Sequence, residues 1–380
     1  MKKNIQLPNY DRSILSISSS IMKYYNVKSN YDSLKELDNI LNKKYKNIVF
    51  LILDCLGTNI LEKNLDANSF LKNNIITNVN TVFPPTTAAA TTSFHSGLSP
   101  LETGWIGWMP YFKEYNKAVV LFTGNDYYSD EPVMDKPENS ILKYETIYEK
   151  ICKKNKNIKY HQCFPSFAEN GSSTFEELCA KIEQSCKNNN ENLVSAYWDE
   201  PDHTIHHTGI NSSEVKKIIK NIDDNLKKLS QKLDNTIIII SADHGAININ
   251  EVYINEIKEI DECLKFPPTI DSRFTTFFIK KGMKNKFKKA FKNTFKDKYI
   301  IYTKKNFLKS GLLGKGIPHK KIDEYFGDYI VIMNSDVSIR YTVNGIKKVH
   351  LADHSGLTKD EMIVPLIVID TNKKWIITKI

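Results

Sequence analysis

Three uninterrupted apolar runs stand out along the chain, and each one ends next to acidic residues. They are NIVFLILD at residues 47–54, LVSAYW at residues 193–198 and TIIIISADHG at residues 236–245. Continuous apolar runs of this length are typical of parallel strands that are covered on both faces. We therefore expect buried strands that carry polar side chains at their carboxyl ends.

Amphipathic helices are predicted between these strands. Apolar side chains recur every three or four residues from 212 to 233, and again from 175 to 182 after a capping box formed by Ser173 and Glu176. Residues 1–45 also have mainly helical patterns. Further short strands are predicted at 75–82, 118–122 and 157–163. Strands that alternate with helices indicate an α/β fold, with a doubly wound and mostly parallel sheet flanked by helices and with ligands at the strand carboxyl ends.

The pattern changes between residues 247 and 347. A lysine-rich amphipathic helix is expected there, between short apolar segments. These segments are FTTFFI, YIIYT and YIVIM. These segments have less of the character of buried parallel strands. We predict that residues 247–347 form an inserted α+β cap subdomain, and that residues 1–246 and 348–380 form the core, to which the chain returns through the strand MIVPLIVID.

The charge of the chain bears on its partners. The formal net charge is +9 in 380 residues, and lysines are densest between residues 280 and 305. A solvated lysine face is favoured there over a nucleic-acid site, because no aromatic-and-glycine RNA motif accompanies the lysines. A chain of this length that is 41% hydrophobic can form one large domain with an insertion, or two domains.

The ends of the chain and its cysteines bear on location. The start MKKNIQLPNYDRS has no apolar signal core, and no segment approaches the ~18 apolar residues of a membrane span. We therefore expect a cytoplasmic protein with no membrane partner. Six cysteines without CxxC spacing are expected to be reduced and mostly buried.

The stretch TVFPPTTAAATTSFHSG, residues 81–97, predicts a helix start. Pro84 and Pro85 cannot continue a strand, whereas the small residues from Thr86 to Ser93 can begin a helix. Unpaired N–H groups and the helix dipole at such a start favour an anion, such as a phosphate or an alkoxide. The same pattern also fits an N-cap threonine on a helix that packs against a sheet.

Aspartate and histidine residues gather at the expected strand ends. The set consists of Asp54, Asp202 with His203, His206 and His207, Asp243 with His244, and His354. These side chains bind zinc and other divalent ions. Asp202 and His206 are four residues apart, so one helical turn would place both on the same face. A set of this size together with one threonine hydroxyl would be enough for two metal ions.

These motifs resemble those of the alkaline phosphatase superfamily, and within it the type I phosphodiesterase and nucleotide pyrophosphatase branch. The resemblance rests on LILDCLG, FPPTTAAATTSFHSGLSP, EPDHTIHHTG, SADHG and DHSG, in this order. It extends over about residues 46 to 370. It implies an alkaline phosphatase-like core and a hydrolase that acts on phosphodiester or pyrophosphate bonds of a small phosphorylated substrate.

The resemblance also implies roles for individual residues. One metal would be held by Asp54, Asp243 and His244 and shared with the nucleophile, and a second by Asp202, His206 and His354. The family spacing between the nucleophile and the glycine at position 97 selects Thr87, with Thr86 as the alternative. Thr87 would attack phosphorus in line and form a phosphothreonine that water then hydrolyses. Zinc is the expected metal and manganese the alternative, and the oligomeric state is left open.

The chain departs from the family pattern at two positions. Cys55 stands where the family usually has glycine, a change expected to affect packing more than chemistry. Trp108 aligns with an asparagine that binds a phosphate oxygen in the family, so Asn125 or the backbone N–H of Thr87 is expected to replace that contact. Three aromatic residues of this segment could either stack on a base or pack beneath the cap: Trp105, Trp108 and Tyr111.

The missing asparagine keeps other substrates open. A phosphomonoesterase, a phosphonate hydrolase or a phosphosugar mutase of the same superfamily would use the same metal site. A polyanion-binding protein that uses the lysines of residues 280–305 is a further alternative. It is the least favoured one because the set of metal ligands is complete.

Overall fold

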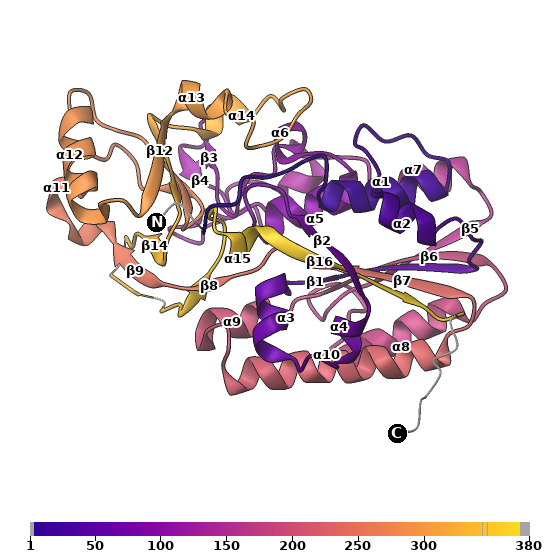
Figure 1. The fold of residues 1–380 in the computed structure, drawn as a ribbon. Coiled ribbons are helices and arrows are strands. Elements are labelled where there is room, and N and C mark those ends of the chain that lie inside the picture. Colours follow the sequence, from indigo (N-terminus) through magenta and orange to yellow (C-terminus); the bar gives the residue numbers. More distant parts are fainter. Residues whose placement is uncertain (1–3, 344, 348, 373–380) are drawn as a thin grey trace.

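A twisted six-stranded sheet forms the centre of one half of the molecule in the computed structural model, which describes residues 4–343, 345–347 and 349–372 (Figure 1). Its spatial order is β2 (Ile75–Asn80), β16 (Ile363–Asp370), β7 (Thr236–Ser241), β1 (Asn47–Leu53), β6 (Glu191–Trp198) and β5 (Ile158–Cys163). Neighbouring strands from β7 to β5 are parallel, whereas β16 is antiparallel to both β2 and β7. The predicted mostly parallel sheet is confirmed.

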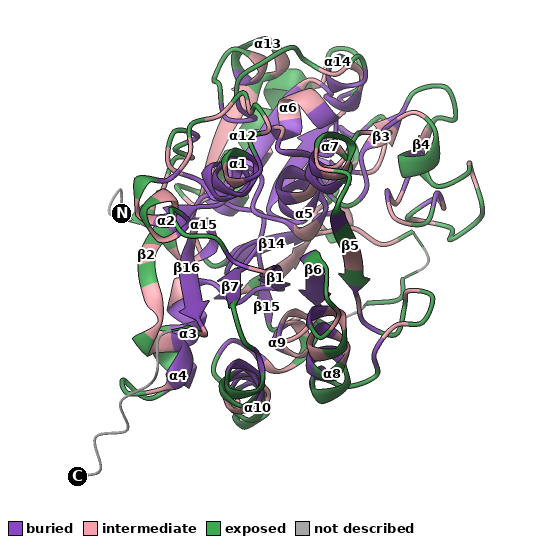
Figure 2. Cartoon of the chain, turned by 90° about the vertical axis from the view of Figure 1, so that its right-hand side faces the viewer, coloured by how far each residue is buried: buried purple, intermediate pink, exposed green. Residues whose placement is uncertain are grey.

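Helices cover both faces of this sheet (Figures 1 and 2). One face is covered by α1 (Ile14–Tyr24), α2 (Lys35–Ile40), α5 (Thr87–Ser96) and α7 (Ile147–Lys154). The other is covered by α3 (Thr58–Asn64), α4 (Phe70–Asn73), α8 (Phe175–Cys186), α9 (Asp202–Thr208) and α10 (Ser213–Lys232). Every residue of β1 and β7 is buried, as their continuous apolar sequences predict.

Two local predictions were wrong. The cap of α8 is Thr174 and not Ser173, because the Thr174 side chain accepts the hydrogen bond from the N–H of Glu177.

The strand expected at 118–122 is reduced to β4 (Lys117–Ala118), which pairs with β3 (Tyr111–Phe112). The chain turns after it, with the N–H of Gly124 bonded to the carbonyl of Val120. Glycine and asparagine in this segment favour a turn over a strand.

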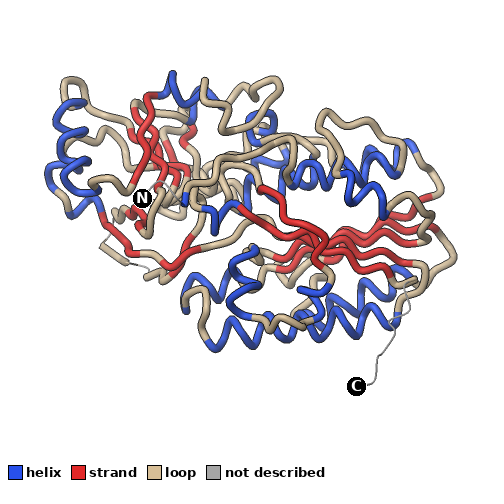
Figure 3. The backbone as a smooth tube through the Cα atoms, in the orientation of Figure 1, coloured by secondary structure: helices blue, strands red, loops and turns tan. Residues whose placement is uncertain are grey.

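A four-stranded antiparallel sheet lies in the other half of the molecule (Figure 3). Its order is β10 (Thr269–Ile270), β11 (Phe274–Phe277), β13 (Tyr329–Met333) and β12 (Tyr299–Thr303). Around it lie α11 (Lys258–Asp261), α12 (Lys284–Phe295), α13 (Lys304–Leu308) and α14 (Ile322–Tyr325). On α12, Phe287, Phe291 and Phe295 are buried. Strands of this sheet fall within residues 247–347, while the domain boundaries themselves stay a prediction.

Short elements complete the fold. Two of these strand pairs are β8 (Ile247–Asn248) with β15 (Ala352–Asp353), and β9 (Asn250–Tyr253) with β14 (Val337–Arg340). Two short helices are α6 (Pro100–Thr103) and α15 (Lys359–Met362). Within the described part of the chain, no helix has both the length and the apolar character needed to cross a membrane. Five of the six cysteines are buried, and Cys152 is partly exposed.

A buried ion pair ties the two halves together. The guanidinium of Arg273 donates through Nε and Nη2 to the carboxylate of Glu361 on α15, at 2.7 and 2.9 Å. Its Nη1 donates to the carbonyls of Ser335 and Val337 at 2.8 and 2.6 Å. Both charged side chains are fully buried. This bidentate geometry compensates for the desolvation of both charges.

Candidate metal centre

Three neighbouring strands of the large sheet, β7, β1 and β6, are followed by acidic residues at their carboxyl ends. Asp54 directly follows β1, Asp243 follows β7 by two residues, and Asp202 begins α9 beyond the end of β6. Two glycines allow the loops to approach, because a Cβ on Gly57 would lie 2.6 Å from the Cα of Gly245. The carboxyl ends of parallel strands thus place their polar side chains together, as expected for an α/β sheet.

A first group of possible ligands consists of Asp54, Asp243 and His244. All three are buried, and one ligand atom from each lies within 4.8 Å of the others. Nε2 of His244 is 3.4 Å from Oδ1 of Asp54 and 3.5 Å from Oδ2 of Asp243. Both of these carboxylate oxygens are buried and have no hydrogen-bond partner among the described residues. Such orphaned buried acceptors are costly unless a cation compensates for them.

A second group consists of Asp202, His206 and His354, again with ligand atoms within 4.8 Å of one another. Nε2 of His206 is 3.3 Å from Oδ2 of Asp202, and Nε2 of His354 is 3.9 Å from Oδ1 of Asp202. The two groups adjoin, because the rings of His244 and His354 stack with their centroids 3.8 Å apart. Each group could offer oxygen and nitrogen ligands to a cation.

The three histidines of these groups share one orientation. Each directs Nδ1 toward a backbone carbonyl: His206 toward Ala352 at 2.9 Å, His354 toward Pro85 at 3.1 Å, and His244 toward Gly245 at 3.2 Å. When Nδ1–H donates to a carbonyl, the lone pair is on Nε2, the atom that faces the carboxylates. This is how proteins orient imidazoles that bind metals.

The two candidate threonines are in different surroundings. Thr87 is the first residue of α5, and its Oγ1 lies 3.2 Å from Nε2 of His244. Thr86 is buried and its hydroxyl donates to Oδ2 of Asp271 at 3.1 Å. The hydroxyl of Thr87 is therefore the one that meets the first group, at a helix start where N–H groups favour an anion.

Burial dominates the acid–base behaviour of the first group. Burial, and then the charges of Asp243 and Asp202, hold the pKa of Asp54 well above its usual range. Burial also raises the pKa of Asp243 to about 6 and lowers the pKa of His244 to about 4. Without a cation, the group therefore favours neutral side chains. A divalent ion would favour the ionised carboxylates.

Asp202 and His206 form a charged pair in the second group. Burial alone would lower the pKa of His206, but the charge and hydrogen bond of Asp202 outweigh it and raise the pKa to about 10. Burial would likewise raise the pKa of Asp202, and the charge of His206 outweighs it and lowers that pKa below its usual range. A bound cation would take the place of the imidazole proton.

A cavity of about 680 Å³ opens over the centre. Its wall includes Thr87, Asp202, His206 and His354. Residues from the 247–347 segment also line it, among them Tyr253, Asp271, Arg340, Tyr341 and Ile346. Trp108 also lines the cavity and is 40% exposed. The volume is in the range of small-molecule sites.

Not every residue singled out in the sequence lies at this site. His203 and His207 are exposed and pack against each other, with ring centroids 5.3 Å apart. Asn125 is not among the residues that line the cavity, and its side-chain amide donates to Asp130 at 3.2 Å. Trp105 is buried and its indole N–H donates to the carbonyl of Leu142, so it packs inside the fold.

Other residues at the site were not predicted from the sequence. Oδ1 of Asp353 accepts the backbone N–H of His354 at 2.9 Å, as Oδ1 of Asp243 does for His244 at 3.0 Å. Nη2 of Arg340 lies 2.9 Å from Oδ2 of Asp353 and 2.7 Å from Nδ1 of His350. The repeated Asp-His dipeptide was a signal for Asp353. Arg340 had no such signal, because it reaches the site only through the pairing of β14 with β9.

The chain matches a known protein family over most of its length. Residues 48–355 match the model of the family described as type I phosphodiesterase / nucleotide pyrophosphatase. Human ectonucleotide pyrophosphatase/phosphodiesterase family member 5 is 35% identical over 112 residues, which cover 27% of this chain and 24% of that protein. The match thus spans about a quarter of the relative's length.

Solved structures share the fold. Murine ectonucleotide pyrophosphatase/phosphodiesterase 5 superposes with a TM-score of 0.61 at 18% identity, covering 84% of this chain and 87% of that one. A murine variant described as inactive, in complex with AMP, gives a TM-score of 0.59 at 16% identity, covering 85% and 87%. Phosphonoacetate hydrolase from Sinorhizobium meliloti, in complex with phosphonoformate, gives 0.58 at 13% identity, covering 84% and 89%.

The sequence and the fold of the chain point to one family. The family model spans most of the chain, and the sheet with helices on both faces is the fold of these structures. The acidic residues and histidines gather where such a sheet binds ligands. The chain therefore belongs to the type I phosphodiesterase / nucleotide pyrophosphatase family, whose model matches residues 48–355.

Proposed function

We propose that this chain hydrolyses phosphodiester or pyrophosphate bonds with two divalent ions and a phosphothreonine intermediate on Thr87. The observation that carries the proposal is the hydroxyl of Thr87, 3.2 Å from Nε2 of His244 and at the start of α5. Asp54, Asp243 and His244 would hold one ion together with Thr87, and Asp202, His206 and His354 would hold the other.

The residues present fit divalent ions. Within the described part of the chain, both groups contain carboxylate oxygens without a hydrogen-bond partner, on Asp54, Asp202 and Asp243. Imidazole and carboxylate ligands suit zinc, which we propose as the metal, with manganese as the alternative. When bound, such ions supply positive charge that lowers the pKa of the hydroxyl and stabilises the leaving oxygen.

The protein side chains would position the reacting groups. Oγ1 of Thr87 attacks phosphorus, the leaving oxygen departs in line, and water later attacks the phosphothreonine and frees the hydroxyl. N–H groups at the start of α5 donate to phosphate oxygens, a contact that replaces the family asparagine lost at Trp108. The hydrogen bond from Thr86 to Asp271 holds the first turn of the helix in place.

We propose a small phosphorylated substrate whose leaving group lies in the cavity against Trp108. The neighbour with a threonine-to-alanine substitution that is described as inactive and complexed with AMP supports a threonine nucleophile and a nucleotide-like substrate. The phosphonoacetate hydrolase supports the alternative of a phosphonate hydrolase, phosphomonoesterase or phosphosugar mutase. The absent asparagine at Trp108 favours that alternative.

Two sequence-based expectations accompany this function. Residues 247–347 would act as a cap, which the positions of Tyr253, Arg340 and Tyr341 in the cavity wall support. A cytoplasmic location stays a prediction from the sequence. The name of the human relative, an ectonucleotide pyrophosphatase/phosphodiesterase, differs from that prediction.

Hydrolysis of matched aryl phosphodiester and phosphomonoester substrates tests the proposal. The protein would be loaded with zinc or manganese, with chelator treatment and Thr87→Ala as negative controls and Thr86→Ala as the neighbouring control. We expect diester turnover that both chelator and Thr87→Ala abolish and that Thr86→Ala retains in part. Turnover of the monoester alone would favour the alternative substrates, and full activity of Thr87→Ala would rule out the phosphothreonine.

A further inference from the structure

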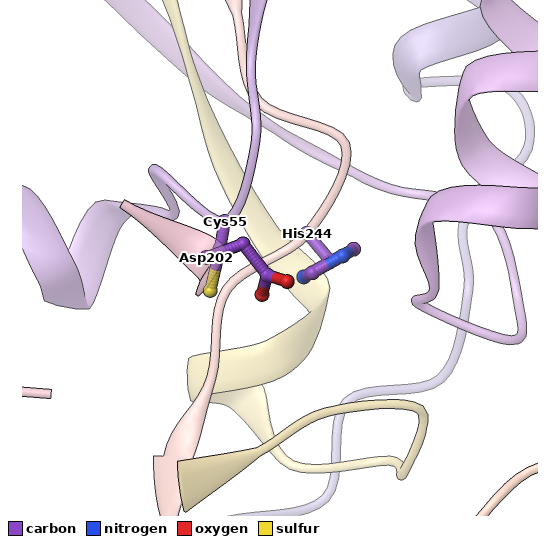
Figure 4. A group of neighbouring side chains, drawn as sticks. All are labelled: Cys55, Asp202 and His244. Atoms are coloured by element: carbon purple, nitrogen blue, oxygen red, sulfur yellow. The ribbon is translucent and has the colours of Figure 1, made fainter. Parts of the chain in front are cut away.

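The thiol of Cys55 lies inside the metal centre. Cys55 directly follows Asp54 and is fully buried. Its Sγ, a carboxylate oxygen of Asp202 and a ring nitrogen of His244 all lie within 4.8 Å of one another. Figure 4 shows the thiol on one side of the Asp202 carboxylate and the imidazole of His244 on the other. Sγ of Cys55 therefore lies within 4.8 Å of a possible ligand atom from each of the two groups.

The backbone of Cys55 has an unusual conformation. Its φ is +61°, in the left-handed region that favours glycine. The two nearby glycines, Gly57 and Gly245, occupy positions where a side chain would clash. A glycine would suit position 55 as well, yet a side chain is present there. Strained residues of this kind cluster at functional sites, where the surrounding structure holds them in place.

Two buried carboxylates close to Cys55 each have one oxygen that is unpaired among the described residues. Oδ1 of Asp243 accepts the backbone N–H of Cys55 at 3.0 Å, while Oδ2 of the same fully buried carboxylate has no hydrogen-bond partner among the described residues. Oδ1 of Asp54, whose side chain is 4% exposed, is unpartnered in the same way and faces Nε2 of His244. Packing would explain a buried thiol, but it does not explain carboxylates left unpaired beside it.

We propose that Sγ of Cys55 is an additional ligand to the divalent ions, positioned between the two groups. The inference rests on the proposed metal centre and adds a sulfur donor to its oxygen and nitrogen ligands. The thiol loses its proton to solvent as sulfur binds the ion. A sulfur donor shifts preference toward zinc, cobalt and cadmium and away from manganese and magnesium. The metal selectivity of this chain would thus differ from that of relatives with glycine at this position.

Cobalt(II) absorption spectra test this role with a readout that does not depend on activity. The metal-free protein is titrated with cobalt, the bound cobalt is counted by elemental analysis, and the near-ultraviolet band of thiolate-to-cobalt charge transfer is recorded. The variants are Cys55→Ala, which keeps Cβ, and Cys55→Gly, which suits the positive φ. The matched control is Cys179→Ala, which removes another buried cysteine, on α8. Thermal melts of each variant verify folding.

We expect the charge-transfer band in the wild type and in Cys179→Ala, and its loss in both variants at position 55. Cobalt that binds without this band, or with a band that both variants at position 55 retain, would overturn the role of Cys55 and leave the proposed centre standing. Absence of cobalt binding in the folded wild type would overturn both. The two failures are therefore distinguishable in one titration.

Discussion

Nε2 of His206 lies 3.3 Å from Oδ2 of Asp202, one turn earlier on α9. The four-residue spacing places both side chains on the inner face of the helix. His203 and His207, on the same short helix, are exposed. The segment EPDHTIHHTG thus contains two proposed metal ligands, Asp202 and His206. It also contains two exposed histidines whose substitution should leave metal binding unchanged.

Substituting Asp202 by Asn is expected to remove one of the two proposed metal ions. The affinity of the second group for zinc should fall by at least about 100-fold. Loss of a residue that only hydrogen-bonds a metal ligand already costs about 10- to 100-fold, and loss of the ligand itself costs more. Calorimetric titration of the metal-free protein with zinc checks this. His207→Asn should bind zinc like the wild type, and an unchanged stoichiometry in Asp202→Asn would refute the assignment.

Trp108 is expected to contribute to substrate binding. Its side chain is 40% exposed and lines the cavity. Stacking of a base on an aromatic ring contributes roughly 1 to 3 kcal/mol, so Trp108→Ala should raise KM for nucleotide-like diesters by about tenfold or more with little change in kcat. Tyr115→Ala is the control, because Tyr115 is 43% exposed and does not line the cavity. Equal KM values in both variants would assign Trp108 to packing.

The ion pair of Arg273 and Glu361 is expected to be important for stability. Arg273→Met leaves a fully buried carboxylate without its cation and should lower the free energy of unfolding by about 3 to 5 kcal/mol. Urea denaturation measures this. The double variant Arg273→Met with Glu361→Leu should recover part of the loss, because no unpaired charge remains, although the N–H groups of Gly356 and Thr358 lose the carboxylate as acceptor. Lys315→Met breaks an exposed pair with Asp11 and should change stability by less than about 1 kcal/mol.

His95 predicts a loss of stability in acid. Burial lowers its pKa from 6.5 to about 4 in the folded state, where its Nδ1 lies 3.1 Å from the hydroxyl of Tyr148. The unfolded chain therefore binds a proton that the folded chain does not bind between these pH values. Stability should fall as pH decreases from about 6.5 to about 4, by roughly 2 kcal/mol, because solvent reaches part of the ring and reduces the cost of charging it.

Denaturant melts across this pH range check the contribution of His95. His95→Gln should have a shallower dependence of unfolding free energy on pH than the wild type. An identical slope in both proteins would mean that other buried groups account for the acid sensitivity.

Much of the fold could be predicted because its signals are local. The apolar runs of β1, β6 and β7 and the apolar stripe of α10 identify elements through periodicity alone. The strand expected at 118–122 was wrong because Gly124 and Asn125 favour a turn, a local signal that competes with the preceding apolar residues. The positions of Arg340 and His350 beside Asp353 depend on strand pairing that no local pattern specifies.

The sequence by itself determined the buried strands, the helix start at Thr87 and the candidate set of acidic residues and histidines. These follow from neighbours in the chain, whose spacing sets which side chains share a face. Only the tertiary structure decided which atoms meet. Thr87 approaches His244 across 157 residues and His354 approaches Pro85 across 269, because strand order and loop packing bring them together. The thiol of Cys55 likewise reached the centre through backbone geometry, which residue type alone does not reveal.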